Sequence, residues 1–142
     1  MKKILVAVDG SKHAEKAMMK AKELAELSNC DITLLNVVDD IMANNPYIIE
    51  SNQQEVVEKA FVEEGETVLK EAIEKFGVFS GKLKTELKYG EPGKTIIETG
   101  EKGKYDLVVM GSRGLNVFSR AMLGSVSNKV VNHIHLSVLI VK

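Results

Sequence analysis

The sequence predicts an α/β fold in which helices cover both faces of a parallel sheet. Five short runs typical of strands are separated by stretches whose apolar residues recur at helical spacing. Strands that are joined by helical crossovers run parallel and are usually buried on both faces. The length of 142 residues is typical of one domain, so we expect residues 1–142 to fold as a single unit.

The first half of the chain carries two continuous apolar runs. Ile4–Val8 predicts the first strand, and Ser11 then begins a helix whose inner stripe is rich in alanine, which allows close packing on the sheet. Ile32–Val38 predicts the second strand. The stretch Asp39–Gln54 has no regular period and contains an Asn-Asn-Pro turn signal, so we expect a loop with a short helical turn.

The second half continues the alternation. An amphipathic helix is predicted from Glu55 to Phe76, with Gly65 as a weak point inside it. Residues 82–89 alternate polar and apolar side chains, with lysine on one face, which is typical of an edge strand with one wet side. The remaining expected elements are a helix from Glu91-Pro92 to Gly100 or Gly103, a strand at Leu107–Met110, a helix at Ser125–Ile134 and a last strand at Leu136–Val141.

Composition and charge exclude several function classes. Nineteen basic and twenty acidic residues give a formal net charge of −1, so a general nucleic-acid binder with a basic face is not expected. No apolar run approaches a membrane span, and the first run is too short for a secretion signal, so the expected location is the cytoplasm. The single cysteine, Cys30, rules out an internal disulfide and a cysteine-based metal cluster.

The strongest functional signal is a glycine-punctuated loop after the fourth predicted strand. Gly111-Ser112-Arg113-Gly114 is followed ten residues on by Gly124-Ser125-Val126-Ser127, where a helix begins. Glycine lets the backbone approach a phosphate and tolerates positive φ, and the amides of a first helical turn have no internal partners. The pattern therefore predicts a phosphate cradle, with Arg113 as countercharge. If the first and fourth strands are neighbours, Asp9 faces this loop across one crevice.

These residues resemble the universal stress protein family, in its ATP-binding branch. The signature of that branch, Gly-two residues-Gly-nine residues-Gly-Ser, is matched by Gly111, Gly114, Gly124 and Ser125, and residues 4–11 and 105–114 agree with it as well. The resemblance implies a Rossmann-like open sandwich with a five-stranded parallel sheet in the order 3-2-1-4-5, and a homodimer. That order places residues 82–89 at an edge, in agreement with their alternating pattern.

The resemblance also implies a ligand and its contacts. The ligand is ATP or another adenine nucleotide, with Mg or Mn, and Asp9 can hold the phosphate-bound cation. The implied contacts are Ala7, Val8 and Asp9 at the base and ribose, Val37 at the adenine, Met110, Gly111, Arg113 and Gly114 around the ribose and phosphates, and Gly124, Ser125, Val126 and Ser127 at the phosphates. One departure is residues 133–137, where the family commonly has a proline; it concerns the detail of the dimer edge.

Each of these features has a plainer alternative. The glycines can form only a tight turn, Asp9 and Ser127 can be turn or cap residues, and Arg113 can point into water. Residues 90–95 look like a P-loop, but two residues between the glycines are too few to wrap a phosphate, so a turn and a helix start are expected. His133 and His135 are more typical of structural or exposed histidines than of a metal pair.

No Ser-His-Asp or Cys-His arrangement is legible, so no dedicated catalytic machinery is predicted. The leading hypothesis is an ATP-binding, dimeric stress-response module that signals to an unidentified protein partner. A slow ATP hydrolase or phosphotransfer enzyme, and a nucleotide-free dimeric interaction protein, are the alternatives. Leu136–Val141 is the expected dimer edge because an uncovered apolar edge invites pairing. Residues 39–54 follow the second strand beside the adenine position and are a candidate lid.

Overall fold

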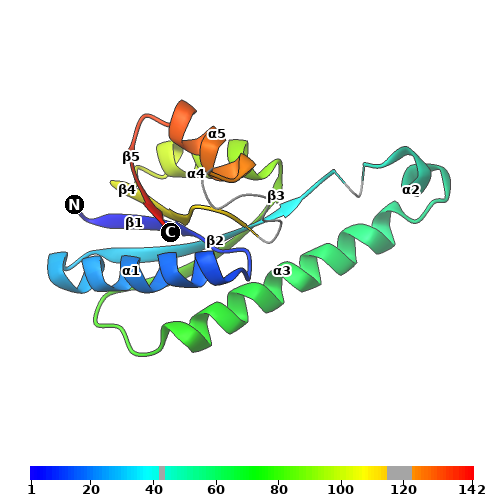
Figure 1. Cartoon of the computed structure of the whole chain (residues 1–142). Coiled ribbons are helices and arrows are strands. Elements are labelled where there is room, and N and C mark those ends of the chain that lie inside the picture. The colour runs from blue at the N-terminus through cyan, green and yellow to red at the C-terminus, as the bar shows by residue number, and fades with distance from the viewer. Residues whose placement is uncertain (42–43, 115–122) are drawn as a thin grey trace.

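The computed structural model describes residues 1–41, 44–114 and 123–142 of the chain. Strands and helices alternate along it, with one extra short helix after the second strand (Figure 1). In chain order the elements are β1 (Lys3–Ala7), α1 (Lys12–Ser28), β2 (Asp31–Asp39), α2 (Pro46–Glu50), α3 (Gln54–Phe76), β3 (Leu83–Gly90), α4 (Pro92–Lys102), β4 (Leu107–Gly111), α5 (Ser125–His133) and β5 (Ser137–Val141).

The strands form one parallel sheet in the order β3-β2-β1-β4-β5, which confirms the predicted fold class and the edge position of β3. The chain turns from one side of β1 to the other between β3 and β4. The register pairs Ala7 of β1 with Leu35 of β2, and Val6 of β1 with Val109 of β4. The carboxyl ends of these three strands therefore meet at one edge of the sheet, where the strand order reverses.

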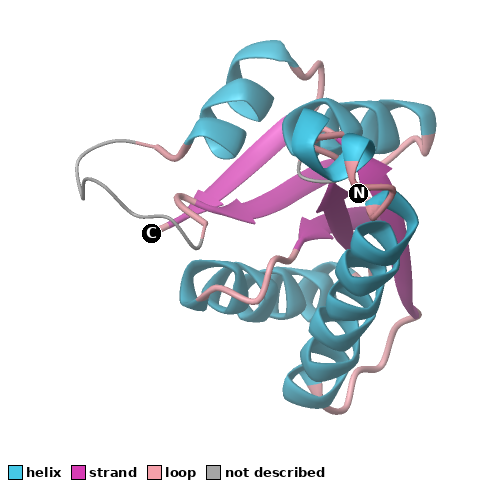
Figure 2. Ribbon diagram, turned by 90° about the vertical axis from the view of Figure 1, so that its right-hand side faces the viewer, coloured by secondary structure: helices cyan, strands magenta, loops and turns pink. Residues whose placement is uncertain are grey.

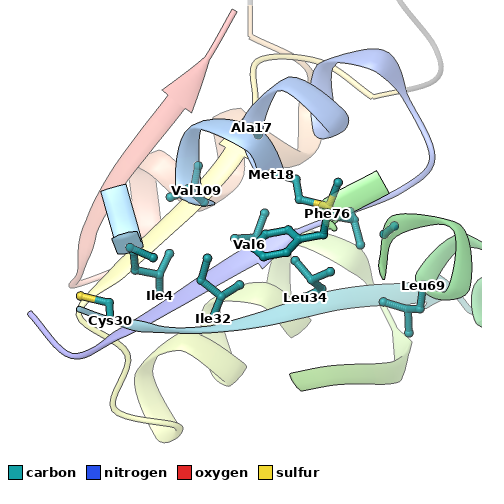
Figure 3. Close-up of a cluster of buried hydrophobic side chains, with 14 residues drawn as sticks. Ile4, Val6, Ala17, Met18, Cys30, Ile32, Leu34, Leu69, Phe76 and Val109 are labelled. Carbon is teal, nitrogen blue, oxygen red and sulfur yellow. The ribbon is translucent and has the colours of Figure 1, made fainter. Parts of the chain in front are cut away.

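Helices cover both faces of the sheet (Figure 2). On the face of α1 and α3, the buried side chains of Ile4, Val6, Ile32 and Leu34 pack against Phe76 and the alanine stripe of α1 (Figure 3). On the opposite face, Leu5, Leu35, Val108 and Met110 pack against Ile96 of α4 and Val130 of α5. Alternate residues of each strand thus serve two different cores, which explains the continuous apolar runs in the sequence.

Helix α1 begins as predicted. The Ser11 hydroxyl accepts a hydrogen bond from the Ala14 amide at 3.1 Å and caps the helix. Ala14, Ala17, Ala21 and Ala25 are all buried on the inner stripe. Their small side chains bring this helix close to β1 and β4, so the cap of α1 is fixed beside the carboxyl edge of the sheet.

Two details of the expected elements were wrong. Gly65 is not a weak point of α3: it is buried, and a Cβ there would lie 2.7 Å from Asn36 Oδ1 and from Leu87 Cδ1, so the missing side chain lets α3 pack tightly on β2 and β3. The exposure of β3 does not alternate strictly either, because Thr85 on its apolar side is exposed and Glu86 on its polar side is half-buried. Both differences concern the contacts that the neighbouring helices, α3 and α4, make with β3.

Helix α3 is longer than the sheet that it covers. Its buried residues, Gly65, Leu69, Ala72 and Phe76, all lie in the second half, and its first half projects past the carboxyl edge together with α2 (Figure 1). Asn45 caps α2 through its side chain, which accepts from the Tyr47 amide at 2.9 Å. Within the described part of the chain, no helix is both long and apolar enough to cross a membrane.

Candidate nucleotide-binding site

A cavity of about 300 Å³ opens at the carboxyl edge, where β1, β2 and β4 end. This is the place where open parallel sheets bind ligands. The residues selected from the sequence all line it: Ala7, Val8, Asp9, Val37, Met110, Gly111, Arg113, Gly114, Gly124, Ser125, Val126 and Ser127. Asp9 and Ser125, which are far apart in the sequence, therefore share one cavity.

Asp9 is held at the mouth of this cavity by the turn that follows β1. The Val8 amide still donates to the Leu35 carbonyl at 2.9 Å, so the backbone follows the sheet for one more residue. The Asp9 Oδ1 atom then accepts a hydrogen bond from the Ser11 amide at 2.9 Å. Oδ2 faces the glycine loop, since a Cβ on Gly114 would lie 2.8 Å from it. The carboxylate is thus oriented by one oxygen and presents the other.

The three signature glycines are required for different physical reasons. A Cβ on Gly111 would lie 2.8 Å from backbone and side-chain atoms of His13, so this glycine lets β4 meet the first turn of α1. A Cβ on Gly114 would meet the Asp9 carboxylate, and one on Gly124 would lie 3.3 Å from the Arg113 Cα. None of the three is among the glycines with positive φ, so close approach, and not a left-handed backbone conformation, is the reason for glycine at these positions.

Helix α5 begins at Ser125 with its first turn on the cavity wall. Gly124 is its N-cap, and no side chain of the described residues caps it, whereas Ser11 caps α1 and Glu91 caps α4. The first amides of a helix have no partner within the helix and carry partial positive charge. The amides at the start of α5 are therefore suited to an anion.

Ser127 contributes to the cavity through the shape of the loop. Its side chain is buried, and its hydroxyl lies 2.8 Å from the Ser112 carbonyl and 3.1 Å from the Gly124 carbonyl, so it donates back to the loop. The Gly124 amide also donates to the Ser112 carbonyl, at 2.7 Å. These bonds join the end of β4 to the start of α5, so the Ser127 hydroxyl positions the helix start.

Arg113 lines the cavity, but its guanidinium is already engaged by the protein. Its Nη2 lies 3.2 Å from Nε2 of His13, on the first turn of α1. His13 was not among the residues selected from the sequence. Its contact with Arg113 joins residues 100 positions apart, and the sequence carries no signal for it.

Several lining residues were not selected from the sequence. Asn36 is buried, and its side-chain amide donates to the Val8 carbonyl at 2.8 Å, which fixes the segment leading to Asp9. The sequence does carry a signal for Asn36, because it is an amide side chain within an apolar run. Asp39 ends β2 as Asp9 follows β1, and that parallel could have been noticed. The remaining walls come from tertiary packing alone: Ala14, Leu35, Pro92 and Ile96.

Glu91 connects the two helices beside the cavity. Its carboxylate accepts from the Gly93 and Lys94 amides at the start of α4, and it pairs with Lys129 of α5 at 2.8 Å. The hydrogen bond from Lys129 is the main reason that the pKa of Glu91 is lowered, and the two amide bonds act in the same direction. The segment that resembles a P-loop is therefore a capped helix start, as expected, with its amides already used.

A larger groove of about 840 Å³ lies between β3 and α4. Its charged lining comprises Lys3, Lys82, Lys84, Lys88, Lys102, Asp31, Glu86 and Glu98. At its base the Tyr105 hydroxyl donates to Thr33 Oγ1 at 2.9 Å, and burial raises the pKa of Tyr105. Long charged side chains make up about half of the lining of this groove.

The described residues contain no cluster of three or more histidine, cysteine, aspartate or glutamate side chains suited to a metal ion. The two carboxylates among the described cavity residues, Asp9 and Asp39, follow different strands. His133 and His135 are exposed, and the His133 Nδ1 lies 2.8 Å from the Lys129 carbonyl on its own helix.

The fold places the chain among open parallel α/β proteins with a cavity at the carboxyl edge of the sheet, and comparison with known proteins gives the family. The profile of the universal stress protein family matches residues 1–142, so the chain belongs to that family. Universal stress protein MJ0531 of Methanocaldococcus jannaschii is 32% identical over 143 residues, which cover 99% of this chain and 82% of that protein.

Solved structures agree on the fold. The universal stress protein UspA from Lactobacillus plantarum has a TM-score of 0.86 and 29% identity, covering 99% of this chain and 97% of that one. The universal stress protein from Archaeoglobus fulgidus in complex with dAMP has a TM-score of 0.71, covering 100% and 98%. At 20% identity, the second likeness concerns the fold alone.

Proposed function

We propose that this chain is an ATP-binding, dimeric regulatory module whose nucleotide state is read by another protein. The proposal rests on one observation: the Asp9 carboxylate, the glycine loop and the start of α5, which no side chain of the described residues caps, converge on a single cavity. Each of these features suits a different part of a nucleotide. They converge where the strand order reverses, which is where open parallel sheets bind nucleotides, with the phosphates at a helix start.

The cavity suggests how a nucleotide would lie. Val37 and Ala7 offer an apolar surface at the ends of β2 and β1 for the base, and Asp9 has a free carboxylate oxygen for ribose hydroxyls. The start of α5 and Arg113 would receive the phosphates. A related universal stress protein of the same fold was solved in complex with dAMP, which supports an adenine nucleotide as the ligand class.

A divalent cation fits this arrangement only as a companion of the ligand. Mg²⁺ prefers six oxygen ligands and is usually held by one or two carboxylates together with substrate phosphates. Of the described residues, Asp9 and Asp39 are the cavity's only carboxylates, so phosphate oxygens would supply most of the coordination. When bound, Mg or Mn would neutralise phosphate charge; Asp9 would hold it from the protein side.

A binding module fits the cavity better than a hydrolase does. Among the described lining residues there is no histidine or cysteine, and Asp9 Oδ1 is occupied by the Ser11 amide. An activated nucleophile needs a base within hydrogen-bond reach, oriented by a third group. The cavity therefore offers contacts for binding and little for turnover, and steady phosphate release from ATP would argue for the enzyme instead.

The dimer would form through β5. This strand pairs with β4 on one side only, because it ends the sheet, and four of its five residues are half-buried apolar side chains. A two-fold partner that aligns its own β5 would satisfy the free edge on both chains. Light scattering at micromolar concentration should give twice the 15.6 kDa of one chain, and a monomer would contradict this part of the proposal.

The nucleotide is tested directly by ligand binding. Mass spectrometry of small molecules released on denaturing the purified protein should detect an adenine nucleotide. Adding ATP with magnesium to about 100 times the dissociation constant should stabilise the fold by about 2.7 kcal/mol, which is roughly 5–10 °C in melting temperature. An unchanged melting temperature with ATP, ADP and AMP would favour the nucleotide-free interaction protein.

A further inference from the structure

We infer that His13 is a positioning residue of this cavity, which holds the Arg113 guanidinium at the phosphate end and so favours nucleotides with several phosphates over the nucleoside. The inference rests on the proposed nucleotide function. His13 is not among the residues that line the cavity, whereas Arg113 is. The imidazole of His13 contacts the Arg113 guanidinium, so we infer that this side chain acts on a ligand through Arg113.

The position of His13 is fixed by packing. It lies in the first turn of α1, directly after the Ser11 cap, and its backbone passes under Gly111 at the end of β4. A Cβ on Gly111 would lie 2.8 Å from the His13 carbonyl carbon and from its Cβ, and 2.9 Å from its carbonyl oxygen. Arg113 follows Gly111 by two residues. The contact between the two side chains thus bridges two backbone segments that are already in close contact.

The chemistry of the two side chains shows which of them donates and which accepts in this contact. Arginine has hydrogen-bond donors only, so in the 3.2 Å contact between Nη2 and Nε2 the histidine nitrogen must accept. An imidazole acceptor orients the guanidinium without bringing the negative charge that a carboxylate would add, and phosphate oxygens are acceptors that a guanidinium binds well.

Orientation in the free protein affects affinity. A long arginine side chain loses rotamer freedom when it is immobilised by a ligand, and this loss opposes binding. If His13 orders the side chain beforehand, part of that cost no longer opposes binding. The gain exists only for ligands that reach Arg113, so ATP should benefit and adenosine should not.

The test compares ATP and adenosine in titration calorimetry of the full chain. We expect His13→Ala to weaken ATP binding by about three- to tenfold, the range expected for the loss of one hydrogen bond, with adenosine unchanged within twofold. His13→Gln keeps an acceptor and should recover most of the ATP affinity. His135→Ala, at an exposed histidine outside the cavity, is the matched control and should behave as wild type.

A double variant tests the route through Arg113. His13→Ala added to Arg113→Ala should cause no further loss of ATP affinity, because the positioned group is already missing. Equal losses for ATP and adenosine in His13→Ala, or tighter ATP binding in that variant, would overturn the inference. A wild-type protein that binds neither ligand would instead refute the proposed function, and the inference with it.

Discussion

Two of the cavities of this molecule differ both in volume and in lining, and the smaller of the two is the better suited to binding a ligand. The groove between β3 and α4, at about 840 Å³, is the larger, and lysine and glutamate side chains surround it. The cavity at the carboxyl edge, at about 300 Å³, is lined by backbone at Gly114 and Gly124 and by the start of α5. Its main-chain groups are already ordered by the fold.

The difference lies in conformational entropy. Immobilising a lysine or glutamate side chain costs up to about 2 kcal/mol, whereas backbone amides at a helix start are already ordered by the fold. The pair Lys88–Glu86, with 3.7 Å between Nζ and Oε2, also satisfies some of the groove's charges internally. The volume of a cavity does not by itself identify a binding site, whereas hydrogen-bond donors that the fold already orders do indicate one. Substitutions in each cavity distinguish these two criteria.

The largest effect is expected from Gly114→Val. Its Cβ would lie 2.8 Å from Asp9 Oδ2, so the side chain would fill the gap between the loop and the carboxylate. ATP affinity measured by calorimetry should fall on the order of 100-fold, about 2.7 kcal/mol. Lys84→Val places the same side chain in the larger groove and should leave affinity unchanged. The reverse outcome would make the groove the nucleotide site.

A smaller loss is expected from Asp9→Ala, about 10- to 100-fold, because hydrogen bonds to a charged group contribute about 1.5–3 kcal/mol. In titrations without a divalent cation, and unlike His13→Ala, it should weaken adenosine and ATP alike, since ribose is common to both. Asp9→Asn keeps an acceptor for the Ser11 amide and should lose less. Asp31→Ala, which removes an acid from the larger groove, is the control, and a similar loss there would contradict the assignment.

A modest pH effect is expected at Glu91, where α4 begins between the two cavities. Its folded pKa lies below its ordinary value, so its stabilising contribution is present above about pH 4.5 and is lost as pH falls through the folded pKa. The carboxylate is 40% exposed, so screening by solvent keeps the contribution below about 1 kcal/mol.

Urea unfolding at pH 7 and at pH 3 provides the measurement. The difference in unfolding free energy between wild type and Glu91→Gln should shrink on acidification, and Lys129→Ala should remove most of the same pH dependence. A difference that grows towards pH 3 would show that the sign is wrong.

The smallest effect is expected from reversing charges in the larger groove. Lys84→Glu combined with Lys88→Glu should change ATP affinity by less than about twofold at 0.15 M salt, where the Debye length is about 8 Å. A loss above tenfold that disappears at high salt would show that the groove's lysines steer the nucleotide into the smaller cavity.

Much of this architecture was predictable because its signals are local. Apolar runs predicted the other four strands, an alternating pattern with lysine on one face predicted β3 and its edge position, and Ser11 predicted the start of α1. Gly111, Gly114 and Gly124 were selected by spacing, and the fold brings them to one cavity with Asp9. Identifying them needed no knowledge of which side chains they would meet.

What could not be predicted depends on contacts between distant segments. Gly65 reads as a helix breaker until its packing against Asn36 and Leu87 is known. His13 and Arg113 are 100 residues apart, and neither carries a local sign of the other. The candidate lid, residues 39–54, also depends on such contacts. Asp39 lines the cavity and the other described residues of this stretch do not, while residues 42–43 lie outside the described chain.

The buried thiol of Cys30 can report on local opening of the sheet. Its side chain is 1% exposed, and its thiol donates to the Met1 carbonyl at 3.2 Å, at the edge of the sheet opposite the cavity. A thiol reagent can react with it only when the strands around it separate. Its labelling rate therefore counts excursions of the amino-terminal strand, and comparing that rate with and without nucleotide measures how far ligand binding tightens the remote end of the sheet.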